Sequence, residues 1–496
     1  MASPRIKVLM ASAEAVPFSK AGGLGDLAGA LPKALWNAKV DARLITPLYG
    51  FIDRKHFHLR RVAGLSEIEI RVGENVFPAR FYRANIPQTR VQAFFVECQT
   101  LFGRDGLYTD PRSGEGYWDN PTRYIFFCKA VVEFLKAEVF TPDIVHLHDN
   151  QTALVAPFLR QEDSCSRLSQ MPVLLTINNL EYQGRYDMRY LYEAGLDSHL
   201  AYPGGPFEFY GDFCFLKAGI VFADQINTVS ESYANESITY PEIGYGLEGV
   251  LLNRRRDYSG IINGIDTTVW DPAKDKLIPK TYTRNSLEGK KINKRALFEK
   301  CGFSGAAMDR PLIGIITRLA GQKGIDLILE AMDSLLALDI RFALLGTGPQ
   351  GYRDALGNAE RRHPERFKYF GMFDETLAHL IEAGSDMYLM PSRFEPCGLN
   401  QLYSLHYGTL PIVRRTGGLA DTVRNYDPES GQGWGFVFDG YNSEEMLATV
   451  ERALRAYEDK SLWNKLMRRA MSLDLSWDTT ARRYRELYLK MIHVER

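Results

Sequence analysis

Short apolar runs alternate with amphipathic stretches along most of the chain, the pattern typical of βαβ units and parallel sheets. In the first half it predicts strands at residues 7–11, 41–46, 91–96, 144–146, 173–176 and 225–228, with helices near 24–37, 122–135 and 152–160. In the second half it predicts strands at 312–317, 341–346, 367–369, 387–390 and 410–413, with helices near 324–336, 376–383, 399–407, 419–425 and 443–457.

This order of elements indicates an α/β protein made of two doubly wound, Rossmann-like halves. The stretch 271–294, with two prolines and mixed charge, is the best candidate for a linker or exposed insertion. Ligands of doubly wound sheets bind beyond the carboxyl ends of the strands. We therefore expect two such sheet edges to face one interdomain cleft that encloses a phosphate-bearing substrate.

Composition narrows the class of protein. The 496 residues are enough for large cores, and 60 basic and 61 acidic residues nearly cancel, which argues against nucleic-acid binding through a basic face. The first residues enter a strand without a signal-peptide apolar core, and no run approaches the length of a membrane span. The six cysteines lack a Cys-x-x-Cys pair, and no spacing suggests a metal site. We expect a cytoplasmic protein that binds neither membrane, nucleic acid nor metal.

The most informative motif is the glycine-rich segment at residues 19–32, between the first strand and the first helix. Glycines such as Gly22 and Gly23 let backbone N–H groups approach an anion, and the helix N-terminus offers unpaired donors. Lys20 adds a full positive charge. The alternative interpretation is an ordinary tight turn between a strand and a helix.

A similar arrangement recurs about three hundred residues later, after the strand at 312–317. Arg318 and Lys323 lie five residues apart in the loop that follows, which suits a diphosphate because Arg binds oxygens bidentately and Lys acts as a point charge. A solvated basic loop is the alternative. The recurrence itself favours a functional site in each half of the chain.

The segment 391–403 places Glu395 between a strand and a helix, where its carboxylate could accept sugar hydroxyls or stabilise positive charge on a sugar ring. The alternative is a carboxylate that only complements a helix dipole. Cys397 is interpreted as a small packing residue at a helix start, a setting that lowers thiol pKa. Downstream, a third glycine pair leads into a helix and is suited to phosphate; its residues are Thr416, Gly417, Gly418 and Leu419.

These motifs, taken in order, resemble the bacterial glycogen synthases and plant starch synthases, glycosyltransferase family 5 with the GT-B fold. The resemblance runs almost from end to end. It is carried by Lys20 to Gly23 with Asp26, the His146 to Asp149 run, Tyr245 to Gly249, Asn263 to Asp266 with Trp270 to Pro272, Arg318 with Lys323, Glu395 to Tyr403, Thr416 to Thr422, and Ser476-Trp477. It implies an N-terminal, acceptor-side domain at 1–262, a nucleotide-sugar domain at 263–477, and a terminal helix at 478–496 that returns to the first domain.

The resemblance also implies the reaction: glucose passes from ADP-glucose to the non-reducing end of an α-1,4-glucan with retained configuration, ADP leaves, and no cofactor or metal is needed. The implied catalytic residues are Glu395, Lys323, Arg318, Asp149 and Asn178. The implied donor-binding residues are Lys20, Gly22, Gly23, Asn263, Arg318, Lys323, Phe373, Thr416, Gly417, Gly418 and Leu419. The implied sugar and acceptor contacts are Glu14, Asp26, Asp149, Glu395, Cys397 and Gly398. For Phe373, expected against adenine, core packing is the alternative.

Two positions depart from the family pattern. Asn150 follows Asp149 where the enteric enzymes have Trp, and Asn178 stands where the family has the histidine that contacts the donor glucose. Asn can donate and accept hydrogen bonds but cannot titrate. The leading hypothesis is an active glucan synthase. The alternatives are a catalytically weak homologue that binds glucan or nucleotide, and a related transferase with another donor or a small acceptor.

Overall fold

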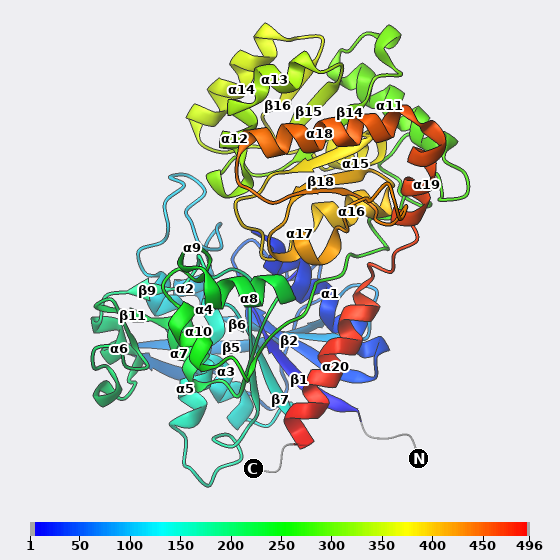
Figure 1. The fold of residues 1–496 in the computed structure, drawn as a ribbon. Coiled ribbons are helices and arrows are strands. Elements are labelled where there is room, and N and C mark those ends of the chain that lie inside the picture. The colour runs from blue at the N-terminus through cyan, green and yellow to red at the C-terminus, as the bar shows by residue number, and fades with distance from the viewer. Residues whose placement is uncertain (1–4, 494–496) are drawn as a thin grey trace. The chain divides into compact units, whose positions relative to one another are not determined.

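The computed structural model of the protein describes residues 5–493, which divide into two compact units, each built around a sheet with helices packed on it (Figure 1). Unit 1 comprises the chain up to Val229, residues Ala234–Ile261 and the segment from Trp477 onward, whereas unit 2 comprises Ser230–Tyr233 and Ile262–Ser476. The elements of the first half of the chain are β1 (Ile6–Ala11), α1 (Gly23–Asn37), β2 (Val40–Pro47), β3 (Arg60–Arg61), β4 (Ile68–Val72), β5 (Asn75–Asn85), β6 (Gln92–Glu97), α2 (Gln99–Phe102), α3 (Asn120–Lys136), β7 (Ile144–His148), α4 (Asn150–Ala153), α5 (Val155–Arg160), β8 (Val173–Ile177), β9 (Arg185–Tyr186), α6 (Arg189–Ala194), β10 (Glu208–Phe209), β11 (Asp212–Cys214), α7 (Phe215–Phe222), β12 (Gln225–Thr228), α8 (Glu231–Thr239), α9 (Pro241–Gly244), α10 (Glu248–Asn253) and β13 (Tyr258–Gly260).

The main sheet of unit 1 has the strand order β13-β12-β8-β7-β1-β2-β6-β5-β3, with β4 paired to β5. From β13 to β6 in that order the strands are parallel, and β5, β3 and β4 add an antiparallel edge. The parallel strands are almost continuous apolar runs because both faces of the sheet are covered. A small separate sheet has the order β10-β11-β9.

The terminal helix α20 (Trp477–His493) belongs to unit 1, where it packs against α1 (Figure 1). Buried hydrogen bonds tie it to the sheet. The Tyr488 hydroxyl lies 2.8 Å from His146 Nδ1, and the Tyr484 hydroxyl accepts from Asn227 Nδ2 at 3.0 Å. His146 Nε2 lies 2.6 Å from the Thr176 hydroxyl, so one polar network joins α20 to three strands.

Unit 2 is a six-stranded parallel sheet with the order β16-β15-β14-β17-β18-β19 and helices on both faces. Its elements are α11 (Glu288–Cys301), β14 (Leu312–Ile316), α12 (Ile325–Glu330), α13 (Met332–Ala337), β15 (Arg341–Leu345), α14 (Gln350–Arg362), β16 (Phe367–Phe370), α15 (Glu375–Gly384), β17 (Met387–Met390), α16 (Asn400–His406), β18 (Leu410–Arg414), α17 (Gly417–Thr422), β19 (Phe436–Phe438), α18 (Ser443–Glu458) and α19 (Lys460–Ala470).

Side chains of β14 point alternately to the two faces of the sheet and so contribute to two apolar cores of unit 2. Ile313 and Ile315 of β14 belong to the larger core, which α12, α13, α14, α18 and α19 complete. Leu312 belongs to the smaller core with Leu297 of α11 and Ile381 of α15. Because successive strand residues point to opposite faces, one apolar run supplies both cores.

The predicted α/β class with parallel sheets is confirmed, but several boundaries differ. Helices expected at 152–160 and 324–336 are each split in two, as α4 with α5 and as α12 with α13. The antiparallel strands β3 to β5, the small β9 to β11 sheet and helices α14 and α19 were not predicted. β3 and the strands of the small sheet have only two or three residues and carry little periodic signal, whereas α14 and α19 are amphipathic helices that the prediction missed.

The interpretation of 271–294 as a linker or exposed insertion holds only in part: most of residues 271–287 are exposed and lie outside helices and strands, but the end of the segment differs. Its last residues form the first half of α11, where Lys290 is buried. The Lys290 ammonium donates to the Thr409 hydroxyl at 2.7 Å and to the Ala383 carbonyl at 3.1 Å. Polar partners about a hundred residues away stabilise this burial, so the local composition could not reveal it.

Candidate active site

The predicted site residues follow strands at the point in each sheet where the strand order reverses. In unit 1 the first strand, β1, lies between β2 and β7; Glu14 follows β1 and Asp149 follows β7. In unit 2 the first strand, β14, lies between β15 and β17; Lys323 follows β14 and Glu395 follows β17. Such switch points are where doubly wound sheets bind ligands.

The glycine-rich turn of unit 1 is held by Glu14, a buried residue. One oxygen of its carboxylate accepts from the backbone N–H groups of Ala21 at 2.6 Å and Gly22 at 2.9 Å, and the other accepts from the Tyr108 hydroxyl at 2.7 Å. Glu14 was predicted to contact substrate. In this structure its hydrogen bonds position the turn, and a contact with substrate stays a prediction.

Gly22 and Gly23 are exposed, and an added Cβ at either position would meet no protein atom within 4 Å. The fold therefore does not require glycine at these two positions for packing, and the space beside them is open to a ligand, although the Gly22 N–H already donates to Glu14. Lys20, at the same turn, forms an ion pair with Asp26, with Nζ and Oδ1 2.7 Å apart. Lys20, predicted to bind phosphate, and Asp26, predicted to contact the acceptor, are thus adjacent, and their opposite charges neutralise each other in this structure.

Asp149 has an unusual backbone and an unusual environment. Its φ of 58° is in the left-handed region, which costs energy for a residue other than glycine and is typical of functional sites. Burial raises the pKa of its carboxyl group to about 7, and the negative charge of Glu14 adds to the increase. A carboxyl group with this pKa changes its charge near neutral pH.

Asn178 donates two hydrogen bonds to the Asp149 carboxylate. Its backbone N–H donates to Asp149 Oδ1 at 2.7 Å, and its side-chain amide donates to Oδ2 at 3.1 Å. Both bonds favour the ionised form of Asp149 and oppose the rise in its pKa. The asparagine at the family's histidine position is therefore a partner of Asp149. The neighbouring Asn150 donates from its amide to the Tyr182 carbonyl at 3.0 Å.

In unit 2 the structure brings Lys323 and Glu395 together across 72 residues of chain. Lys323 Nζ lies 2.6 Å from Glu395 Oε2, and the Ser392 hydroxyl donates to the same oxygen at 3.1 Å. The Glu395 side chain is 6% exposed and that of Lys323 is 19% exposed. Ser392 was not predicted; its place three residues before Glu395, at the end of a strand, is the signal that could have indicated it.

Arg318 is exposed, and its guanidinium has no hydrogen-bond or ion-pair partner among residues 5–493. A cation in this state beside a strand end is available to an anionic ligand. Phe373, in the loop between β16 and α15, is 67% exposed. The alternative that Phe373 packs in the core is therefore wrong. Its exposed ring is compatible with stacking against an adenine base, which stays a prediction.

The third glycine motif is used largely by the protein itself. The Gly418 N–H donates to the Glu395 carbonyl at 2.9 Å and the Leu419 N–H to the Thr416 carbonyl at 3.0 Å. A Cβ on Gly417 would overlap the Glu395 carbonyl oxygen, so the glycine permits close packing of the two loops. Two of the N–H groups predicted to bind phosphate therefore already have partners in the protein.

Two further predicted residues lie beside this loop. Burial raises the pKa of the Cys397 thiol to about 12, so the prediction that the helix start lowers it is wrong; desolvation outweighs the helix dipole. Asn263 is buried, and its Oδ1 has no hydrogen-bond partner in the part of the chain that the structure describes. An unpaired buried amide oxygen is suited to a hydroxyl donor from a ligand.

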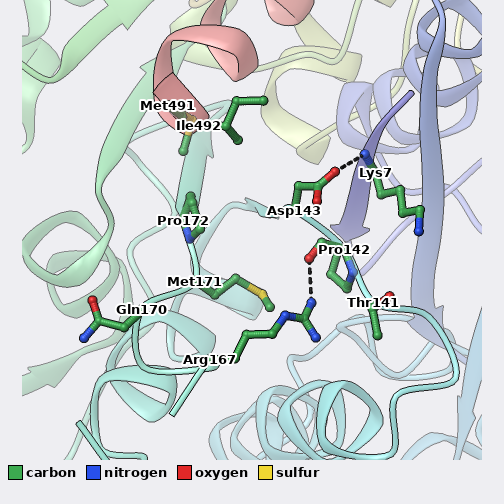
Figure 2. A pocket seen from close by; sticks show the side chains of 10 residues that line it. All are labelled: Lys7, Thr141, Pro142, Asp143, Arg167, Gln170, Met171, Pro172, Met491 and Ile492. Atoms are coloured by element: carbon green, nitrogen blue, oxygen red, sulfur yellow. Dashed lines mark hydrogen bonds between the residues drawn. The ribbon is translucent and has the colours of Figure 1, made fainter. Parts of the chain in front are cut away.

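The pocket in Figure 2 lies at the other edge of the unit 1 sheet. Lys7 is in β1, Asp143 directly precedes β7 and Pro172 directly precedes β8, so these residues stand at the amino ends of the strands. Glu14 and Asp149 follow the carboxyl ends. This pocket is therefore distinct from the predicted active site.

Two doubly wound sheets with cationic loops at their switch points are the arrangement expected of the GT-B class of glycosyltransferases. Family models match in both halves: "Starch synthase catalytic domain" over residues 7–253 and "Glycosyl transferases group 1" over residues 299–469. The glycogen synthase of Thermotoga petrophila is 41% identical over 98% of this chain and 99% of that protein. The glycogen synthase of an Anaeromyxobacter species is 42% identical over 97% of this chain and 99% of its own length.

Among solved structures, the catalytic domain of starch synthase IV from Arabidopsis thaliana, bound to ADP and acarbose, superposes with a TM-score of 0.89. It is 33% identical and covers 99% of this chain and 100% of that one. Sucrose-phosphate synthase from Thermosynechococcus elongatus, 15% identical with a TM-score of 0.58, shares the fold. The chain belongs to the glycogen and starch synthase family and is a glycosyltransferase. No helix of residues 5–493 is long and apolar enough to cross a membrane.

Proposed function

We propose that the protein transfers glucose from ADP-glucose to the non-reducing end of an α-1,4-glucan and releases ADP. The observation that carries the donor side is the Lys323–Glu395 pair at the switch point of unit 2, together with Arg318 in the same loop as Lys323, whose guanidinium has no partner within residues 5–493. Two cations at the end of a parallel strand suit a diphosphate, and the adjoining carboxylate suits the sugar. Glycogen synthase relatives that match the whole chain support the glucan acceptor.

In the proposed reaction the bond between the anomeric carbon and the diphosphate oxygen breaks, and its electron pair leaves with ADP. Arg318 and Lys323 stabilise the negative charge that develops on the departing phosphate. Glu395 stabilises the positive charge on the glucose ring. The acceptor's 4-hydroxyl oxygen forms the new bond from the face that the leaving group vacates, and its proton passes to a phosphate oxygen of ADP.

The residues of unit 1 are proposed to position sugar and acceptor. Asp149, held by Asn178, accepts a hydrogen bond from a hydroxyl of the transferred glucose. Lys20 exchanges Asp26 for a phosphate oxygen when the donor binds, and the Asp26 carboxylate accepts a hydrogen bond from an acceptor hydroxyl. Asn263 and Phe373 of unit 2 contact the glucose and the adenine, respectively. Among residues 5–493 no group of three or more His, Cys, Asp or Glu residues is placed to hold a metal ion, and we propose no cofactor.

A second function is favoured by one observation. The Asn178 amide is committed to Asp149, so the donor glucose would lose a contact if no other group replaces the family's histidine. A catalytically weak homologue that binds glucan and nucleotide is the corresponding proposal.

ADP release with glycogen as acceptor distinguishes the two functions. Wild type and Asn178→His are compared with ADP-glucose and with UDP-glucose; glucose incorporation into glycogen is measured for both donors, with ADP release in parallel for ADP-glucose. Lys323→Ala serves as the control for contaminating activity. We expect wild type to release ADP, and Asn178→His to change kcat by no more than about a hundredfold. An inactive wild type beside an active Asn178→His would refute the synthase function in favour of the binding homologue.

A further inference from the structure

The hairpin formed by β10 and β11 carries an exposed tyrosine in a strained conformation. Pairing of Phe209 with Asp212 leaves a two-residue turn of Tyr210 and Gly211, with φ values of 51° and 85°. Positive φ at both positions defines the type I′ turn, whose first position favours Asn, Asp or Gly. The Tyr210 side chain is nevertheless 74% exposed. It therefore adds neither favourable turn geometry nor core burial to the fold.

The orientation of the Tyr210 ring is fixed by its neighbours. Its centroid lies 4.7 Å from that of Phe209, and the Arg185 guanidinium carbon lies 5.8 Å from it. A Cβ added to Gly246 would lie 3.1 Å from Tyr210 Cε2, so the ring edge packs directly against the Gly246 backbone. The ring is held in one place while most of its surface stays accessible to solvent.

A continuous set of contacts leads from Tyr210 to the catalytic carboxylate. Gly246 follows Tyr245, whose carbonyl accepts from the Gln183 amide at 3.0 Å. Tyr182, next to Gln183, is 49% exposed, and its carbonyl accepts from the amide of Asn150, the residue after Asp149. All of these residues belong to unit 1. The run Tyr245 to Gly249 was singled out in the sequence, and no step of the proposed reaction uses it.

We propose that Tyr182 and Tyr210 form a binding track for the acceptor, on which glucose units of an α-glucan chain stack as the chain leads away from Asp149. This inference rests on the proposed function. Pyranose rings present an apolar C–H face and a rim of hydroxyls, which matches a fixed aromatic ring with polar neighbours.

Charge argues against a phosphate ligand on the same surface. The cation beside Tyr210 is Arg185, and its guanidinium is paired with the Asp212 carboxylate at 2.8 Å. With its charge neutralised, Arg185 offers hydrogen bonds to hydroxyls without a net attraction for an anion. A neutral sugar polymer therefore fits the track better than the nucleotide does.

The decisive variant is Tyr210→Asn, because it should weaken maltoheptaose binding without lowering the stability of the fold. Asn is favoured in a type I′ turn, so we expect the variant to melt at the same temperature as wild type or a higher one. Loss of the ring should raise the dissociation constant for maltoheptaose about tenfold. Tyr192→Asn is the matched control: Tyr192, on α6, is 66% exposed and should leave binding unchanged.

Binding of maltoheptaose is measured by calorimetry without donor, and initial rates are then measured with maltoheptaose and with maltose. We expect Tyr210→Asn to raise KM for maltoheptaose about tenfold and to leave KM for maltose and for ADP-glucose unchanged, because a short acceptor does not reach Tyr210. Tyr182→Ala should weaken both acceptors because Tyr182 is nearer Asp149. Unchanged maltoheptaose binding in an active Tyr210→Asn enzyme would overturn the track. An inactive wild type that still binds maltoheptaose through Tyr210 would instead refute the proposed function alone.

Discussion

The Lys323–Glu395 ion pair makes a sharp prediction about the donor site: Glu395→Gln should abolish most turnover and yet bind ADP more tightly. A phosphate in contact with Lys323 would be about 5–6 Å from the Glu395 carboxylate. At an effective dielectric constant of about 20, one unit charge at that distance is repelled by about 3 kcal/mol, and solvent screening reduces this to about 1–2 kcal/mol. Removing the carboxylate charge should therefore tighten ADP binding about 5- to 30-fold.

The same substitution removes the group that stabilises charge on the sugar, so kcat/KM should fall by about 2–4 kcal/mol, which is about 30- to 1,000-fold. Glutamine keeps an oxygen that can accept from Lys323 and Ser392, so the loop should stay folded. Lys323→Ala should lower kcat/KM by a similar amount but weaken ADP binding. Comparison of the two substitutions therefore distinguishes the role of Glu395, which acts on the sugar, from that of Lys323, which binds the phosphate.

ADP binding is measured by calorimetry for wild type and both variants, and turnover by ADP release. Glu360→Gln is the matched control, since Glu360 also pairs with a lysine, Lys368, at 2.6 Å in unit 2 and has no proposed role in the site. It should leave ADP affinity unchanged. If Glu395→Gln weakened ADP binding as much as Lys323→Ala, the proposed division of roles would be refuted.

Three further predictions concern other parts of the chain. Asp149→Asn should stabilise the protein relative to wild type increasingly as pH rises from about 4 to 8, by about 4 kcal/mol over the whole range, because the folded-state pKa of about 7 exceeds the ordinary value of 3.8. The raised pKa favours folding only while the carboxyl group is protonated. Melting temperatures of the two proteins that differ by a constant amount across this range would contradict the prediction. Phe373→Ala should weaken ADP binding by about 1–2 kcal/mol, whereas Met372→Ala, at the still more exposed neighbouring position, should not; calorimetry can test both. Tyr488→Phe should lower the free energy of unfolding by about 1–3 kcal/mol, because it leaves a buried nitrogen of His146 unpaired. Unfolding in denaturant measures this change, and an unchanged free energy would show that the α20 network adds no stability.

Most strands of the two parallel sheets could be predicted from the sequence because they are compact runs rich in apolar residues, but the three-residue edge strands β13 and β19 were missed. The run at Met387–Met390 matches its prediction residue for residue, and so does Gln225–Thr228. Helix ends were harder, because α12 and α13 are separated by a single residue that periodicity cannot detect. The buried start of α11 was missed because the partners of Lys290 are distant in sequence.

The sequence by itself determined the fold class, the family and the placement of cationic and acidic residues at strand ends, since these depend on local runs and spacings. Only the tertiary structure decided which side chains meet. Lys323 and Glu395 pair, Asp149 takes Asn178 as its partner, and Glu14 bonds to the glycine turn. The first two pairs join loops that follow different strands, and parallel strands bring such loops to one sheet edge, whereas Glu14 and the glycine turn belong to the same loop after β1. Electrostatics and burial at that edge, which set the pKa of Asp149, therefore depend on the fold as a whole.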